Sequence, residues 1–305
     1  MFAAVIPAKN EEKSILAVLT TVLRLPVDYI ILVLNGCTDR TLELTRSIHD
    51  ARIHILFFSD SLGIDIPRAI GALYAHHLGV DGALFVDGDM SGDIYQNLQA
   101  LISTVNSGVD VALTNCYPYI TNRQKLANLV LKFRAKLNRE LDLFKSLGLS
   151  TPTHGPHALS RRALQTLPSE AIAIPPLTLY WAKKNDLLIK VATSIPHEGL
   201  RSPRKHRSHA RLIAETIIGD CLMGITLSQN QSAARSLGKH QLSGYHPERR
   251  FDLLQTWQQA LKAQDIFYEQ HIIIPRIPAA PGNSPESMFK ACDQQLKEKP
   301  NESKY

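Results

Sequence analysis

The chain has 305 residues, 44% of them hydrophobic and 20% charged, which is enough for one large α/β domain or a domain with a smaller appendage. No apolar run approaches the roughly 18 residues of a membrane span, and the N-terminal MFAAVIPAKNEE lacks the basic start of a signal peptide. The four cysteines show no CxxC spacing, which argues against a zinc ribbon or a disulfide scaffold and favours a reducing cytoplasm. A net charge of +6 is compatible with nucleic acid, a membrane surface or phosphorylated substrates.

The first 115 residues alternate short apolar runs with helical patterns. Asp65 is a candidate N-cap for the third helix, and Thr38 or Asp39 for the second. Repeated strand–helix units predict a mostly parallel sheet with helices on both faces, and ligands bind such sheets at the carboxyl ends of the strands. We therefore expect residues 8–11, 35–39 and 87–89 on one rim. The predicted strands are 2–7, 29–34, 52–58, 82–87 and 109–115, and the predicted helices are 11–25, 38–50, 65–79 and 91–108.

The second half has a less regular pattern. From Pro275 onward, prolines and polar residues predict an extended arm and a disordered end. Before it we expect a basic helix over 123–147, a strand entering a helix over 154–164, a strand over 186–195, a basic loop leading into a helix over 197–225, and a helix over 249–270.

An acidic turn follows the fourth predicted strand, in the sequence ALFVDGDMSGD. Asp87 and Asp89 flank Gly88, and Asp93 follows four residues later. Carboxylate oxygens suit Mg²⁺ or Mn²⁺, and the glycine lets the backbone approach a ligand closely. An ordinary turn with an acid near a helix N-terminus is the alternative.

Four segments resemble, in order, the signatures of family 2-type glycosyltransferases with the GT-A fold. They are VIPAKNEEKSI, VLNGCTDRT, GIDIPRAIGALYA and FVDGDM, all within the first ninety residues. Farther on, HGPHALSRRAL is similar to the acceptor-side segment of the family. GLRSPRKHRSHARL resembles the His-Arg-rich loop of the glucosyl- and mannosyl-phosphoglycerate synthase branch. The resemblance covers roughly residues 2 to 225 and implies the GT-A fold: a mostly parallel central sheet with helices on both faces, plus a helical C-terminal extension.

The resemblance also implies roles for individual residues and segments. It implies a nucleotide-sugar-binding half over 1–115, an acceptor half with a basic metal or phosphate loop over 116–230, and a helical extension with a partly disordered arm over 231–305. Asp87 and Asp89 would be catalytic, with Asp87 on the ribose or the sugar and Asp89 on the metal together with His206. Donor nucleotide binding is expected from Pro7, Ala8, Asn10, Glu11, Asn35, Gly36, Arg68, Asp87 and Gly88, and acceptor binding from Asn115, His154, Gly155 and Arg207.

Two departures from the family pattern concern acids. Aspartate is common at or next to Asn35, and the acceptor-side helix often carries an Asp or Glu as general base. Thr178 stands at the latter place and is the third candidate catalytic residue, although a threonine is no general base near pH 7. The acid then comes from elsewhere, or the reaction retains configuration without an enzyme base, or activity is weak.

The basic loop RSPRKHRSHAR has three interpretations. It is a solvated loop, a nucleic-acid patch, or a site that captures the donor diphosphate and an anionic acceptor. Against nucleic acid, the loop has no interleaved aromatic residue. His209 and His197 are rivals of His206 as metal ligands, and His154 is equally compatible with a structural turn.

We therefore expect a cytoplasmic, Mg²⁺- or Mn²⁺-dependent hexosyltransferase that uses a UDP- or GDP-linked sugar and a small hydroxyl acceptor, with phosphate or carboxylate on the acceptor as one form. We expect no nucleic-acid partner and no membrane span, and the second-half helices and the arm would allow a homodimer. The alternatives are a nucleotide-sugar-binding protein with weak or no transferase activity, and a sugar-phosphate nucleotidyltransferase. The latter ranks lower because no glycine-rich loop follows the first strand. A dinucleotide oxidoreductase is disfavoured because no GxGxxG follows a strand.

Overall fold

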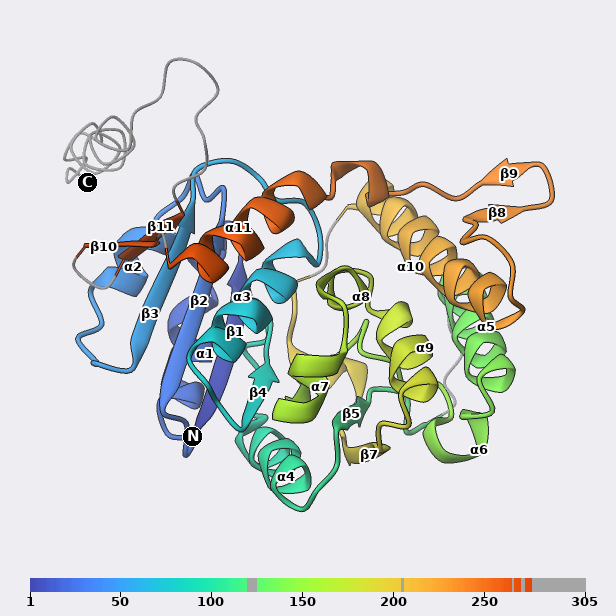
Figure 1. Cartoon of the computed structure of the whole chain (residues 1–305), viewed down its shortest axis with the longest axis horizontal. Coiled ribbons are helices and arrows are strands. Elements are labelled where there is room, and N and C mark those ends of the chain that lie inside the picture. The colour runs from blue at the N-terminus through green and yellow to red at the C-terminus, as the bar shows by residue number, and fades with distance from the viewer. Residues whose placement is uncertain (120–124, 204–205, 265, 270–271, 276–305) are drawn as a thin grey trace, which may run out of the picture.

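The computed structural model describes residues 1–119, 125–203, 206–264, 266–269 and 272–275. One mixed sheet forms its centre (Figure 1), and its strand pairs are parallel except where β6 lies between β4 and β5 and where β10 pairs with β11. Its nine strands run in the order β10 (Ile266–Glu269), β11 (Ile272–Pro275), β3 (Ile53–Phe58), β2 (Tyr29–Asn35), β1 (Phe2–Ala8), β4 (Gly82–Phe85), β6 (His157–Ser160), β5 (Val111–Asn115) and β7 (Ile189–Ser194).

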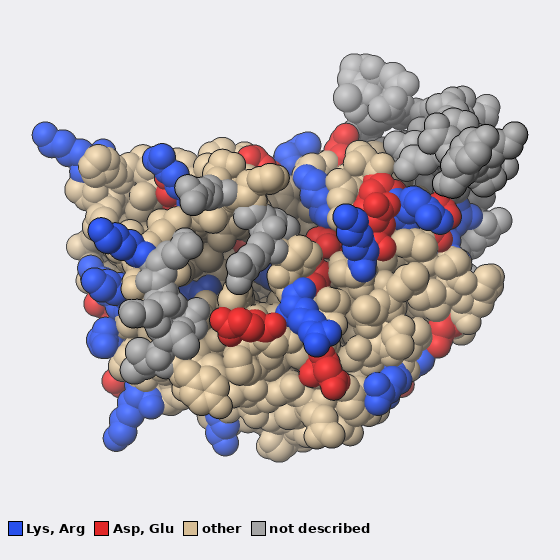
Figure 2. Space-filling model, turned by 180° about the vertical axis from the view of Figure 1, so that it is seen from behind, with Lys and Arg blue, Asp and Glu red and all other residues tan. Residues whose placement is uncertain are grey.

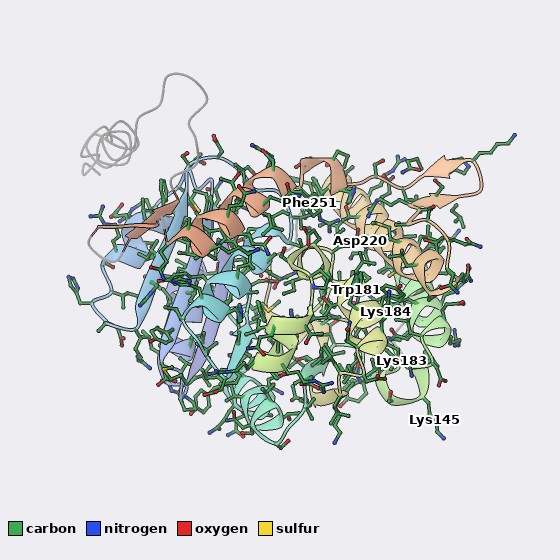
Figure 3. All side chains as sticks on the ribbon, in the orientation of Figure 1. Lys145, Trp181, Lys183, Lys184, Asp220 and Phe251 are labelled. Carbon is green, nitrogen blue, oxygen red and sulfur yellow. The ribbon has the colours of Figure 1, made fainter. Side chains whose placement is uncertain are left out.

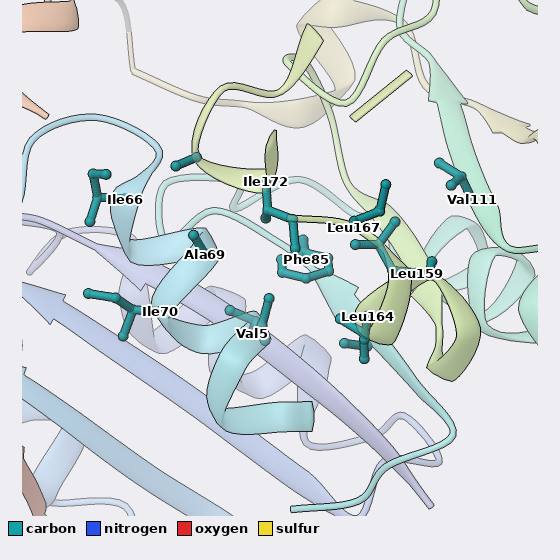
Figure 4. Packing of buried hydrophobic residues seen from close by; sticks show 14 of the residues in the cluster. Val5, Ile66, Ala69, Ile70, Phe85, Val111, Leu159, Leu164, Leu167 and Ile172 are labelled. Carbon is teal, nitrogen blue, oxygen red and sulfur yellow. The ribbon is translucent and has the colours of Figure 1, made fainter. Parts of the chain in front are cut away.

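The central strands are buried on both faces, which explains why they are almost wholly apolar in sequence. In β1, Ala3 and Val5 join one hydrophobic cluster while Ala4 and Ile6 join another on the opposite face. Figure 4 shows the first cluster, where Val5 and Phe85 of the sheet pack against Ile70 and neighbouring side chains from the covering helices. Both faces therefore need helical cover.

Helices supply that cover from both sides. Helix α3 packs on β1 and β2, and α11 packs on α3 (Figure 1), whereas α1, α2 and α4 contribute to the cluster on the other face. Helix α10 packs along α5 and α9. A short antiparallel pair, β8 (Ser236–Leu237) and β9 (His240–Gln241), follows α10. The helices are α1 (Ile15–Val22), α2 (Thr41–Arg46), α3 (Ile66–His77), α4 (Tyr95–Asn106), α5 (Lys125–Glu140), α6 (Phe144–Leu147), α7 (Arg161–Thr166), α8 (Ser169–Ala173), α9 (Pro176–Lys184), α10 (Arg207–Ser228) and α11 (Phe251–Ala263), with 3₁₀ turns η1 (His197–Leu200) and η2 (His246–Glu248).

The predicted sheet of the first half is confirmed, but the bounds of two helices are wrong, and the N-cap of α2 is Arg40 and not Thr38 or Asp39. The helix expected over 249–270 ends at Ala263, and β10 follows it. The helix expected over 123–147 divides into α5 and α6. Asp65 does occupy the N-cap position of α3, but its side chain makes no capping hydrogen bond and forms ion pairs instead. The arm expected beyond Pro275 lies outside the described residues.

On one face of the molecule the charged side chains are dispersed. On the face shown in Figure 2, Lys and Arg side chains stand in separate groups, several of them next to Asp or Glu, and the described residues there form no continuous basic stripe. Within the described part of the chain, no helix combines the length and the apolar character that crossing a bilayer requires.

Candidate functional site

A cavity of about 730 Å³ opens at the carboxyl ends of β1, β2 and β4. Its wall combines segments from both halves of the chain with residues that follow α10. The lining residues are Pro7, Ala8, Lys9, Glu11, Asn35, Ser61, Gly63, Ile64, Asp65, Pro67, Arg68, Asp87, Gly88, Asp89, Met90, Thr153, His154, His197, Leu200, Ser202, Pro203, His209, Ala210, Ile213, Thr216, Ile217, Tyr245 and Glu248.

The turn after β1 is fixed by the turn after β2. Asn10 adopts a left-handed conformation (φ 57°), and its side-chain oxygen accepts from the backbone N–H of Thr38 at 2.7 Å. The backbone N–H of Glu11 donates to the Thr41 hydroxyl at 2.8 Å, and that hydroxyl donates to Asp39 at 2.6 Å. The Thr-Asp-x-Thr segment thus braces the first motif, which leaves Glu11 in the cavity wall.

Asn35 is buried and satisfied by backbone partners. Its Oδ1 accepts from the N–H of Leu62 at 2.6 Å, and its Nδ2 donates to the carbonyl of Gly63 at 3.1 Å. Gly36 has φ +58°, and a Cβ there would approach the backbone nitrogen of Ser61 to 2.8 Å, so only glycine fits without strain. Asn35 therefore shapes the wall by holding the loop after β3.

The acidic turn after β4 is held by an arginine from α3. Arg68 donates through Nη2 to both carboxylate oxygens of Asp87, at 2.6 and 2.7 Å, and through Nη1 to Asp65. The Gly88 N–H donates to the carbonyl of Pro7 at 2.9 Å, which ties the turn to the end of β1. We call Asp65, Arg68, Asp87 and Asp89 the acidic cluster.

Burial and neighbouring charges shift the pKa values of two side chains in the acidic cluster. Burial alone would lower the pKa of the Arg68 guanidinium, but Asp87 and Asp65 raise that pKa above its usual value. Burial raises the pKa of Asp65, and the guanidinium groups of Arg68 and Arg249 oppose that rise. The cluster is thus stable only while its charges remain paired.

A neutral imidazole lies behind this cluster. His157 of β6 stacks on Phe85 of β4 with ring centroids 4.9 Å apart. Burial, and then the positive charge of Arg68, lower the pKa of His157 to about 3. The imidazole therefore stays neutral near pH 7 and adds no charge beside Arg68.

Asp89 faces the basic loop of the second half. Its Oδ1 accepts from the Ser202 hydroxyl at 3.2 Å, and the N–H of Gly92 donates to the carbonyl of Leu200 at 3.1 Å. A Cβ on Gly92 would come within 1.9 Å of the Gly199 carbonyl oxygen, so the two segments are in close contact. His206, four residues beyond Ser202, is exposed at the N-cap position of α10 and does not line the cavity.

Four further side chains form a hydrogen-bonded chain into the cavity wall. Arg134, buried on α5, donates to the Tyr117 hydroxyl at 2.9 Å, and that hydroxyl lies 2.6 Å from Nδ1 of His154. Nε2 of His154 lies 3.0 Å from Nδ1 of His197. We call Tyr117, Arg134, His154 and His197 the histidine cluster, and no carboxylate takes part in the hydrogen bonds just described.

Thr178 lies apart from the cavity. Its side chain on α9 is buried, and the hydroxyl donates to the carbonyl of Ala171 at 2.9 Å. Asn115, at the end of β5, accepts from the N–H of Tyr117 at 2.9 Å. Gly155, with φ +81°, lies against Cys116, where a Cβ would come within 2.5 Å of the sulfur. These three residues shape local structure.

The cavity lining therefore contains most of the candidate donor-binding residues. Several of the acceptor, metal and catalytic candidates lie outside it. Asn10, Gly36, Asn115, Gly155, Thr178 and His206 are outside its lining, and α10 begins at Arg207, whose side chain lies outside the described part. The lining that sequence reasoning missed includes Asp65, which was expected only as a helix cap, and Tyr245 and Glu248, for which no motif gives a signal. The lining residues expected at this rim are Pro7, Ala8, Glu11, Asn35, Arg68, Asp87, Gly88, Asp89 and His154.

A divalent cation would find a sparse set of protein ligands here. Among the described residues, no group of three or more His, Cys, Asp or Glu side chains is arranged to hold a metal ion. A Mg²⁺ or Mn²⁺ ion at Asp89 would thus depend on oxygens of another molecule, and diphosphate oxygens supply such ligands. Asp89, whose carboxylate lies in the cavity wall, would then be the protein ligand of such an ion.

Comparisons with known proteins show the family and the fold of the chain. The model of Glycosyl transferase family 2 matches residues 3–167. The chain is similar to the solved glucosyl-3-phosphoglycerate synthase from Mycobacterium tuberculosis in complex with phosphoglyceric acid, with 18% identity and a TM-score of 0.54 over 74% of this chain and 80% of that one. The same synthase in complex with Mn²⁺ and uridine-diphosphate-glucose gives 18% identity and a TM-score of 0.51 over 72% and 79%. A solved mycobacterial protein has 17% sequence identity to this chain and a TM-score of 0.52, over 74% of each chain.

At these identities the structural similarity shows a shared fold. It confirms the predicted GT-A fold, with its mostly parallel sheet and helical C-terminal region. A search of curated proteins finds no match to the sequence.

Proposed function

The chain belongs to glycosyl transferase family 2, and on that premise we propose that it transfers a sugar from a UDP- or GDP-linked donor, with Mg²⁺ or Mn²⁺, to a small hydroxyl acceptor that carries phosphate or carboxylate. The observation that carries the proposal is the acidic cluster, where Arg68 holds Asp87 at a cavity rim beside Asp89. This arrangement places one carboxylate in a fixed position and leaves the other beside the loop of the second half.

The donor nucleotide would lie along the carboxyl ends of β1 and β2. Glu11 would accept from ribose hydroxyls, while Pro7 and Ala8 would form the floor. Asn35 would act indirectly, since its amide already holds the backbone of Leu62 and Gly63. Asn10 and Gly36 would likewise fix the turns around the nucleoside.

The donor diphosphate and a cation would bind at Asp89. The family resemblance makes His206 the proposed second protein ligand; in this structure its side chain is exposed outside the cavity lining, and the rival ligands His197 and His209 line the cavity. A bound cation would offset the charge that develops on the departing diphosphate. Asp87, held by Arg68, would orient the sugar so that its anomeric carbon faces the acceptor.

The acceptor would bind at the histidine cluster. Two imidazoles line the cavity there, and Arg134 adds a buried positive charge behind Tyr117. Imidazole and guanidinium groups favour a phosphate or carboxylate on the acceptor. The synthase of similar fold in complex with phosphoglyceric acid supports this acceptor class. Gly155, Asn115 and Arg207 would contribute by shaping the same region.

Calorimetry with UDP and with GDP, each with and without Mn²⁺, tests the proposal. We expect metal-enhanced binding of one of the two nucleotides, and Asp89→Asn should abolish the enhancement. Absence of metal-enhanced binding to either nucleotide would contradict the donor site. If binding occurs, hydrolysis or transfer from the matching nucleotide sugar separates a transferase from a protein that only binds the donor.

His206 has its own test. His206→Ala should weaken nucleotide binding in Mn²⁺ but not without metal, since the imidazole would contact only the cation. His240→Ala, on the exposed β9 strand, is the matched control. Equal affinity of His206→Ala and the control would remove His206 from the metal site.

The cellular and oligomeric parts of the proposal rest on the sequence. Cysteines without CxxC spacing support a cytoplasmic enzyme, and the proposed homodimer rests on the second-half helices and the C-terminal arm expected from the sequence. Light scattering of the full chain tests the dimer directly.

A further inference from the structure

A line of ion pairs runs from the acidic cluster into the part of the chain that follows α10. Asp65 accepts a hydrogen bond from Nη1 of Arg68 and another from Arg249, the latter at 2.9 Å. Arg249 donates to both oxygens of Asp220 on α10, at 2.9 and 2.7 Å. Arg235 also donates to Asp220. Figure 3 shows Asp220 on α10 near Phe251 at the start of α11.

Burial increases from Asp87 to Arg249 along this line, and Asp220 and Arg235 beyond Arg249 are also buried. The Asp87 side chain is 26% exposed, while those of Asp220 and Arg249 are 1% and 0% exposed. Arg249 also donates to the imidazole of His246 at 3.0 Å, and burial, with the positive charges of Arg235 and Arg249, lowers the pKa of His246 to about 4. The line thus contains equal numbers of guanidinium and carboxylate groups, and loss of one would leave a buried charge uncompensated.

The residues around Arg249 also contact the loop after β3, which Asn35 of the VLNGCTDRT motif binds. The N–H of Arg250 donates to the Leu62 carbonyl at 3.0 Å, and Nε of Arg249 lies 3.4 Å from the Ile64 carbonyl. Gly63 lies so close that a Cβ would come within 2.2 Å of the Glu248 carbonyl oxygen. Because Asn35 binds the backbone of this loop, the residues around Arg249 support the VLNGCTDRT motif through the loop. Through Asp65 they also support the acidic turn after β4.

We propose that Arg249 is a positioning residue of the donor site, acting through Asp65 and Arg68 on Asp87 and through the loop after β3 on Asn35. This inference rests on the proposed function. It makes the residues from His246 to Arg250, which precede α11, part of the support behind the donor site, although the family model ends at residue 167.

The physical reason lies in how Arg68 divides its donors. Its Nη1 serves Asp65 and its Nη2 serves Asp87, so a displaced Asp65 draws the guanidinium away from Asp87. Arg249 fixes Asp65 from the opposite side and neutralises it. Without Arg249, burial raises the pKa of Asp65 further, so this carboxyl loses charge and no longer fixes Nη1 of Arg68.

Arg249→Gln, Arg249→Lys and the control Trp257→Phe test the proposal. Trp257 is fully buried on α11, which follows Arg249, and donates to the Ile70 carbonyl at 3.2 Å, so its variant weakens the packing of α11 but removes none of the ion pairs. Each protein would be measured for its thermal midpoint, its affinity for UDP and GDP in Mn²⁺, and its KM for the donor sugar and for the acceptor.

Arg249→Gln should weaken nucleotide affinity and raise the donor KM at least about tenfold, as loss of a supporting contact behind a ligand typically does. Arg249→Lys keeps the charge but cannot span Asp65 and Asp220, so it should fall between Arg249→Gln and wild type. Trp257→Phe should lower the thermal midpoint and leave affinity unchanged.

Wild-type affinity in Arg249→Gln would overturn the proposal, as would equal loss of affinity in Arg249→Gln and Trp257→Phe at equal loss of thermal midpoint. If Arg249→Gln does not fold, Arg249→Lys decides: wild-type donor affinity overturns the proposal and weakened affinity supports it. Wild-type protein that binds neither nucleotide in Mn²⁺ would overturn the proposed function and this inference together.

Discussion

In the acidic cluster, Asp87 shares Arg68 with a buried carboxylate, whereas in the histidine cluster His154 lies between a tyrosine hydroxyl and a second imidazole. The first is a network of full charges that reaches into the core of the chain. The second is a relay of polar rings with one buried guanidinium behind it. The cavity thus combines a rigid charged wall with one whose hydrogen bonds depend on which ring nitrogens carry protons.

This contrast indicates different tasks for the two clusters. A donor diphosphate and its cation need carboxylates in fixed positions, because charge placement in a poorly solvated site determines catalysis. An anionic acceptor needs hydrogen-bond donors. The loop that carries His197 and Ser202 joins the clusters, since Ser202 donates to Asp89.

The largest effect is expected in the acidic cluster. Asp87→Asn keeps the shape but removes the charge opposite Arg68, and breaking a largely desolvated charge pair costs about 2–5 kcal/mol, so kcat/KM for the donor should fall by roughly 100-fold. Steady-state kinetics with the donor sugar would measure it. Asp81→Asn, at an exposed aspartate outside the cavity, should match wild type. Comparable activity of the two variants would show that the charge at Asp87 has no role.

A smaller and more selective effect is expected in the histidine cluster. His154→Phe keeps a ring but removes the hydrogen bonds that hold Tyr117 and His197, so the donors of the cluster lose their positions and affinity for phosphoglyceric acid should fall by about tenfold. Calorimetry with that probe, in the presence of nucleotide and Mn²⁺, would measure the loss, with His240→Phe as control. Nucleotide affinity should stay unchanged. A fall in nucleotide affinity instead would break the division between the two clusters.

The smallest effect is expected at Thr178, outside both clusters. Thr178→Val removes the hydroxyl that donates to Ala171, which should cost about 1 kcal/mol of unfolding free energy and leave the kinetic constants unchanged. Denaturant unfolding and steady-state kinetics on the same preparation test this. A large loss of turnover in a stably folded Thr178→Val protein would restore Thr178 as a catalytic residue.

Much of the donor side was predictable because its residues follow strands whose pattern is strong. The apolar runs that end at Ala8, Asn35 and Phe85 predict parallel strands, and their carboxyl ends meet at one edge. The role of Asp65 was not predictable, since an acid before a helix normally indicates a cap. Only its two arginine partners, one of them 184 residues away, show that it is part of an ion-pair network.

The sequence by itself determined the family, the order of the rim motifs and the carboxylates of the acidic turn, because these depend on residues close together in the chain. The tertiary structure decided which side chains surround them. Arg249 reaches Asp65 because α11 packs on α3, and His154 reaches His197 because β5 pairs with both β6 and β7. Such contacts follow from burying helices on both faces of a sheet, and no local pattern encodes them.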